Sequence, residues 1–144
     1  MTSQTPDPDV PATGDFAQQV TPLLTDLLYP SESDEPIEVV ETHLRPTEPL
    51  TPSHLKEWLM LPPAVYVEEV PEADFWSPVT TVEDWFGKEE QAIAERFQVL
   101  KETVERLLTD RQVFRVGDTE IDVYLLGKPA EGARVGLKTR VVET

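Results

Sequence analysis

The chain of 144 residues contains no cysteine, only two histidines, and only 12 lysines and arginines against 28 aspartates and glutamates. The lack of cysteine excludes disulfides, thiolate nucleophiles and cysteine-ligated metals. The shortage of basic residues leaves a formal net charge of −16. A chain with this charge would repel phosphate backbones and acidic membrane surfaces. We therefore expect no direct binding of nucleic acid and no association with membranes.

Long apolar runs are also lacking, and the first ten residues, MTSQTPDPDV, have neither the basic nor the apolar segment of a secretory signal. We therefore expect a soluble, cytoplasmic protein. Apolar residues nevertheless make up 39% of the chain and aromatic residues 8%, which is enough for a packed core. This length is typical of a single domain.

Acidic residues and prolines are concentrated in the first part of the chain. Residues 1–87 carry 17 acidic and 2 basic side chains, a net charge of −15, whereas residues 88–144 carry 11 and 10, a net charge of −1. Residues 1–14 combine Pro, Ser, Thr and Asp with almost nothing apolar. This composition predicts a disordered N-terminal tail over residues 1–14, followed by one domain over residues 15–144.

Apolar periodicity predicts helices and strands in irregular alternation. We expect Asp15 to cap a first helix, which Pro22 either kinks or restarts, and Thr51 with Pro52 to begin a short second helix. The capping-box spacing of Thr80 and Glu83 precedes a helix of about 20 residues after Gly87. Its predicted apolar stripe consists of Ile93, Phe97, Leu100, Val104, Leu107 and Leu108. Strands are predicted over residues 37–44, 65–70, 112–116, 119–126 and 133–142. This irregular order favours an α+β fold over a doubly wound one.

Familiar catalytic motifs are missing: the chain has no glycine-rich phosphate loop, Walker motif, nucleophile elbow or two-histidine metal motif. His43 and His54 fall on different predicted elements, and we expect neither to be catalytic. Asp118, Glu120 and Asp122 share one face of a predicted strand and could bind a hard cation. A solvated outer face is the favoured interpretation, because apolar residues alternate with these carboxylates on the opposite face.

Three segments are less well explained as ordinary surface or core. The acidic segment SESDE, residues 31–35, lies between a helix and a strand, where a carboxylate can project from a rigid frame, although simple solvation also explains it. In Asp84-Trp85-Phe86, either one aromatic residue is an exposed interface anchor or both fasten the helix start to the core. Thr144 directly follows the last predicted strand, which would hold its carboxylate near the sheet edge, although chain ends usually fray.

These segments carry a family resemblance. The stretches LLYPSES, TTVEDWF, RQVFRVGDTEIDVYLLG and KTRVVET, in this order around the long helix, resemble the nuclease A inhibitor family. The resemblance covers residues 15–144 and is strongest from Asp74 onward and in the SES segment. It implies a three-layer α/β/α sandwich similar to the pathogenesis-related protein 1-like fold, with a mixed sheet and a long central helix. It also implies a partner, a sugar-nonspecific DNA- and RNA-cleaving endonuclease of the ββα-metal class.

The resemblance assigns roles to individual residues. Glu32 would enter the nuclease active site in place of the scissile phosphate, and Thr144 would place an oxygen on the catalytic Mg²⁺, forming a metal bridge. Asp84 and Trp85 would supply a second contact. The partner nuclease would supply the Mg²⁺, so the chain would need no cofactor of its own. A carboxylate can mimic phosphate charge, and Mg²⁺ prefers oxygen ligands.

We therefore interpret the sequence as that of a non-enzymatic nuclease inhibitor that occludes an active site through Glu32, Asp84, Trp85 and Thr144. The alternative is an acidic protein-interaction or scaffold module without inhibitory activity. A third and least favoured hypothesis is a cation-dependent enzyme that uses the carboxylates of Asp118, Glu120 and Asp122. The high negative charge would also draw an inhibitor toward a basic nuclease groove.

Overall fold

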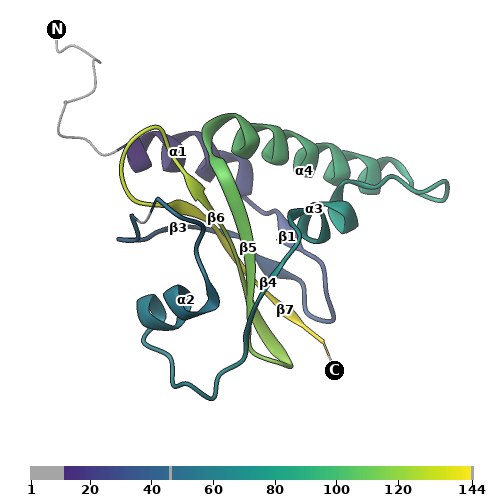
Figure 1. Cartoon of the computed structure of the whole chain (residues 1–144). Helices are drawn as coiled ribbons and strands as arrows, with labels where there is room; N and C mark the ends of the chain where they lie inside the picture. Colours follow the sequence, from purple (N-terminus) through teal and green to yellow (C-terminus); the bar gives the residue numbers. More distant parts are fainter. Residues whose placement is uncertain (1–11, 46, 144) are drawn as a thin grey trace, which may run out of the picture.

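The computed structural model describes residues 12–45 and 47–143, and its central feature is an antiparallel sheet (Figure 1). Within those residues the sheet has five strands in the order β3-β7-β6-β5-β4. In chain order they are β3 (Glu38–Glu41), β4 (Val67–Val70), β5 (Thr109–Val116), β6 (Glu120–Lys128) and β7 (Val135–Val142). A separate small hairpin pairs β1 (Leu28–Tyr29) with β2 (Glu35–Pro36).

Helices cover both faces of the sheet (Figure 1). They are α1 (Ala12–Val20), the 3₁₀ helix η1 (Thr21–Leu24), α2 (Pro52–Leu59), α3 (Glu72–Thr80) and α4 (Lys88–Leu107). Side chains along each strand alternate between the two faces. In β6, Ile121 and Val123 join a large apolar cluster with α1, α3 and α4, whereas Tyr124 and Leu126 join a smaller cluster with α2. The core is therefore divided in two by the sheet.

The sequence explains where two helices begin. Thr51 caps α2 as predicted, because its Oγ1 accepts a hydrogen bond from the backbone N–H of His54, and His54 Nδ1 accepts one from the backbone N–H of Thr51 at 2.9 Å. Pro52 occupies the first helical position. The long helix α4 has 20 residues and follows Gly87, whose backbone N–H donates to Glu90 Oε1 at 3.0 Å.

Several expectations need correction. Asp15 lies inside α1 and not at its N-cap, because the helix begins at Ala12. At Pro22 the α-helix has ended, and a separate 3₁₀ helix, η1, follows it. Thr80 does not cap a helix, since it is the last residue of α3, a helix that the sequence analysis missed. The sheet is antiparallel and not mixed, because short connections join β5 to β6 and β6 to β7 and reverse the chain direction each time.

The α+β class is confirmed, and the likeness to the pathogenesis-related protein 1-like fold stays a prediction. Of the predicted N-terminal tail, residues 1–11 lie outside the described residues and residues 12–14 belong to α1. None of the helices in the described part of the chain is long and apolar enough to cross a membrane.

Tyr29 fastens the small hairpin to the large core. Its ring stacks on Phe75 of α3 with centroids 5.0 Å apart and meets the edge of Phe97 of α4. Its hydroxyl donates a hydrogen bond to the backbone carbonyl of Phe75 at 2.7 Å. Burial raises the pKa of Tyr29 to about 12, because the phenolate would lose its hydration. This strand leads directly into the SES segment, so Tyr29 fixes one end of that loop.

We expect the raised pKa of Tyr29 to make the protein less stable in alkali. In the unfolded chain the phenol has its ordinary pKa of 10.0, whereas in the folded chain its pKa is about 12. The contribution of Tyr29 to stability is therefore fully present below pH 10 and is lost as the pH rises through 12. Urea unfolding from pH 7 upward measures this decline, which Tyr29→Phe should make shallower.

At pH 7, Tyr29→Phe should lower the free energy of unfolding by about 1 kcal/mol, because the hydrogen bond from the Tyr29 hydroxyl to the carbonyl of Phe75 is lost. Tyr66→Phe is the matched control, since the Tyr66 side chain is mostly exposed, and it should change the stability at pH 7 little. Equal effects of the two substitutions would contradict the anchoring role of Tyr29.

Candidate functional site

The SES loop, residues 31–33, connects β1 to β2 and is stiffened by its own serines. Ser31 Oγ donates to the carbonyl of Ser33 at 2.6 Å and accepts from the backbone N–H of Ser33 at 3.1 Å, and Ser33 Oγ donates to Glu35. Both serines are half-buried, whereas Glu32 between them is exposed. The loop therefore presents the Glu32 carboxylate from a hydrogen-bonded turn.

The SES loop is hydrogen-bonded to the end of β7. The backbone N–H of Val142 donates to Ser31 Oγ at 3.1 Å, and the backbone N–H of Glu32 donates to the carbonyl of Val142 at 3.4 Å. The first of these contacts joins residues that are 111 positions apart in the sequence. The structure thus brings Glu32 next to the strand that leads to Thr144, although Thr144 itself lies outside the described residues.

Glu143 is the last described residue, and contacts on two sides hold it. Its backbone N–H donates to the carbonyl of Thr119 at 2.9 Å, and its carboxylate forms an ion pair with Arg115 of β5 at 2.6 Å. The sequence gives no sign of the role of Arg115, because a basic residue on a strand does not reveal a partner 28 positions away. The β5–β6 hairpin therefore fixes the direction in which the chain leaves the sheet.

Asp84 and Trp85 lie in a turn between α3 and α4. Both are exposed, and the exposed fraction of Trp85 is 72%. Phe86 is half-buried, and its ring meets that of Trp85 edge to face with centroids 4.7 Å apart. Trp85 is thus available to a partner, as the anchor interpretation requires, and does not fasten the helix to the core. Phe86 is the more buried of the pair.

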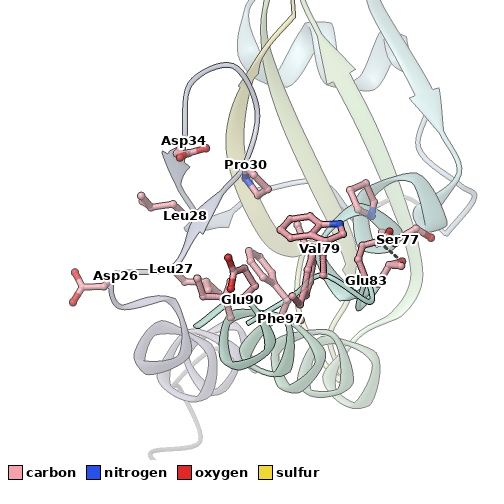
Figure 2. Close-up of a pocket in the computed structure, with 16 residues that line it drawn as sticks. Asp26, Leu27, Leu28, Pro30, Asp34, Ser77, Val79, Glu83, Glu90 and Phe97 are labelled. Carbon is pink, nitrogen blue, oxygen red and sulfur yellow. Dashed lines mark hydrogen bonds between the residues drawn. The ribbon is translucent and has the colours of Figure 1, made fainter. Parts of the chain in front are cut away.

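Two cavities adjoin at the base of the SES loop. The larger, which we call the Trp85 groove, has a volume of about 840 Å³ and is lined by residues of β1, the C-terminal part of α3, the α3–α4 turn and α4. Figure 2 shows Leu28 and Pro30 on one side of it, opposite Glu90 and Phe97 of α4. A smaller cavity of about 310 Å³ lies under the loop and is lined by Glu32, among others.

Pro30 lines both cavities, as does Pro78. Trp85 lines only the larger cavity, and Asp84 lines neither of the two. The residues proposed from the sequence therefore fall into two neighbouring groups, one at the SES loop and the end of β7 and one at the α3–α4 turn. A specific interface typically buries about 800 Å² per partner, and these two neighbouring groups of residues can lie within one contact of that size.

Helical spacing in the sequence predicts Ile93 on the buried stripe of the long helix, with Phe97, Leu100 and Val104. This prediction is wrong for Ile93. The buried stripe runs through Ala94 instead, and Ile93 is 48% exposed and lines the Trp85 groove. Ala94 and Phe97 are three residues apart, so helical spacing fits either assignment. Only the packing of α4 against α3 decides between them.

The carboxylates of the β5–β6 hairpin do not form a metal site. Arg140 of β7 pairs with Asp122 at 3.1 Å and with Glu120 at 3.3 Å. The hydrogen bond that Arg140 Nε donates to Asp122 Oδ1 raises the pKa of Arg140 above its usual value. Among the described residues no group of three or more His, Cys, Asp or Glu side chains is arranged to hold a metal ion. The described residues therefore do not support the hypothesis of a cation-dependent enzyme.

The sequence model of a family described as "Nuclease A inhibitor-like protein" matches residues 14–144, which include the SES loop, the α3–α4 turn and the end of the last strand. No curated protein matches the sequence. Because the match extends over nearly the whole chain, this protein belongs to the nuclease A inhibitor-like family.

Proposed function

We propose that this protein inhibits a sugar-nonspecific endonuclease of the ββα-metal class by occluding its active site, and that it has no catalytic activity of its own. Membership of an inhibitor family supports a nuclease as the partner. The observation that carries the proposal is the pair of hydrogen bonds between the SES loop and Val142. They join the loop that carries an exposed carboxylate to the end of β7, which supports a single contact surface for the loop and the segment after β7.

Glu32 acts as the phosphate mimic in this proposal. A nuclease active site binds the negative charge of a scissile phosphate with cationic groups, and a carboxylate presents a charge of the same sign. The exposed position of Glu32 lets it enter a concave site. The hydrogen bonds of Ser31 and Ser33 hold the loop before binding, so little conformational entropy is lost on association.

Thr144 supplies the metal contact in this proposal. Its hydroxyl is an oxygen ligand of the kind that Mg²⁺ accepts in place of water. The nuclease provides the Mg²⁺, so the inhibitor keeps no metal of its own. The contacts of Glu143 with Thr119 and Arg115 support this role, because they fix the residue that precedes Thr144.

Asp84 and Trp85 form the second contact in this proposal. An exposed tryptophan is a typical hot-spot residue, because its large ring is desolvated when a partner covers it. The carboxylate of Asp84 adds charge complementarity to a basic surface. The position of Trp85 in the groove that adjoins the SES loop supports contact with the same partner.

The decisive experiment is a titration of several ββα-metal nucleases with the intact protein, with DNA cleavage as the readout. Stoichiometric loss of cleavage of at least one nuclease is the expected result. If no nuclease is inhibited and none forms a complex on gel filtration, the protein is instead an acidic interaction or scaffold module that has kept the fold.

We expect Trp85→Ala to weaken the complex by about 2 kcal/mol or more, because a hot-spot ring would be lost from the interface. The melting temperature should hardly change, since Trp85 is 72% exposed. Met60→Ala is the control, because Met60 is 88% exposed and follows α2 on the other face of the sheet. A large fall in melting temperature for Trp85→Ala would show that the ring is structural instead.

Deletion of Thr144 should raise the inhibition constant at least about tenfold in the presence of Mg²⁺, because the metal loses an oxygen ligand from the inhibitor. The deletion should leave the melting temperature unchanged. Glu32→Gln is the matched comparison, and it should lose affinity both with Mg²⁺ and with metal-stripped nuclease, since its role is charge mimicry. Inhibition that depends on neither Thr144 nor the metal would contradict the metal bridge and leave only steric occlusion.

A further inference from the structure

The Trp85 groove exposes apolar side chains that proteins usually bury. Trp85 is 72% exposed, Ile93 of α4 48%, and Leu28 of β1 46%, and all three line the groove. Buried Phe97 and Val79 form part of its lining as well (Figure 2). Contiguous exposed apolar surface of this kind marks an interaction site. Ile93 and Leu28 lie beyond the contact assigned to Asp84 and Trp85, so the proposed function does not explain their exposure.

The rim of the groove carries negative charge only. Asp26, Asp34, Glu83 and Glu90 line it, and all four are exposed. No lysine, arginine or histidine is among the described residues that line it. Carboxylates beside apolar, low-dielectric walls act on a ligand more strongly than carboxylates on an open surface. The groove therefore favours a ligand that is apolar on one side and positively charged at its margins.

We propose that the Trp85 groove docks an apolar, positively charged segment of a partner protein, in the manner of an amphipathic helix lying in an apolar groove. Charge complementarity between the four rim carboxylates and basic side chains of that segment carries the choice of occupant. A second copy of this chain, with a net charge of −16, would place like charges together. Residues 1–11 contain Asp7 and Asp9 and no basic residue, so the same repulsion disfavours them.

The position of the groove connects it to the inhibitory surface. Pro30 and Pro78 line both the groove and the cavity under the SES loop. A nuclease seated on Glu32 would therefore reach the groove by continuing along the same surface. This identification of the partner as the nuclease rests on the proposed function, whereas the docking of a basic apolar segment does not.

The docking is tested without any nuclease, with synthetic peptides as probes. The first probe is a fluorescently labelled amphipathic helix of leucine and lysine. One twin replaces its leucines with serine, the second replaces its lysines with glutamate, and the third replaces its lysines with glutamine. Fluorescence anisotropy with the full chain at physiological salt should show each twin binding at least about tenfold more weakly than the leucine–lysine peptide.

Two substitutions on α4 locate the binding surface. Ile93→Lys places a positive charge inside the groove, and Val99→Lys places the same charge on the same helix at a residue that is 47% exposed and does not line the groove. Ile93→Lys should weaken binding of the leucine–lysine peptide about tenfold or more, and Val99→Lys about twofold at most. If the Ile93→Lys variant fails to fold, the Leu28→Gln variant takes its place in the experiment. It should weaken binding of the leucine–lysine peptide by the same factor.

Three results would overturn the proposal. Equal weakening by Ile93→Lys and Val99→Lys would mean that the peptide binds elsewhere. Equal binding of the serine twin would reduce the interaction to general attraction toward an acidic protein. Equal binding of the glutamine twin would show an apolar site that does not select for charge. Because the assay contains no nuclease, each of these results is distinguishable from a failure of the inhibitory function.

Discussion

The hydroxyl of Ser31 is the contact on which the arrangement of the site depends. It accepts hydrogen bonds from the backbone of Ser33 within its own loop and from the backbone of Val142 at the end of β7. One oxygen thus fixes the shape of the SES loop and its position against the sheet. Tyr29 adds a second attachment, because it holds the strand before the loop against α3. The loop has few residues, but it is constrained on both sides.

The ion pairs and the excess negative charge lie mostly in different parts of the sequence. Arg111, Arg115, Lys128 and Arg140, all from the second part of the chain, form ion pairs, and most of their partners are carboxylates of that same part. Three of the four, Arg115, Lys128 and Arg140, are therefore paired with carboxylates of the β5–β6–β7 region. Glu32 on the SES loop and Glu83 and Asp84 in the α3–α4 turn carry part of the negative charge of residues 1–87, and all three are exposed to a basic partner.

Local signals in the sequence were enough to predict several elements. Thr51 and Pro52 marked the start of α2, and a repeated apolar stripe predicted the length of α4. The helix α3 was missed because prolines at 71 and 78 are typical of breaks, yet Pro71 stands at its N-cap and Pro78 lies near its end. Burial of Phe75 and Trp76 in the large cluster stabilises this helix despite its prolines.

Long-range contacts were beyond the reach of sequence reasoning. Glu32, Asp84, Trp85 and Thr144 could be named as site residues only through the family resemblance, since no local pattern links them. The bond between Ser31 and Val142 and the pair between Arg115 and Glu143 depend on how the strands are ordered in the sheet. The exposure of Ile93 depends on the packing of α4, which helical periodicity alone does not determine.

A double-mutant cycle on a nuclease that the protein inhibits tests most directly whether the SES loop and the chain end act as one unit. The cycle compares Ser31→Ala, deletion of Thr144 and the combination of both, with the inhibition constant as the readout. If the loop positions the chain end, the two losses should be less than additive by about 1 kcal/mol, because Ser31→Ala already releases the strand that carries Thr144. Strictly additive losses would contradict the account, since they would show that the loop and the chain end bind independently.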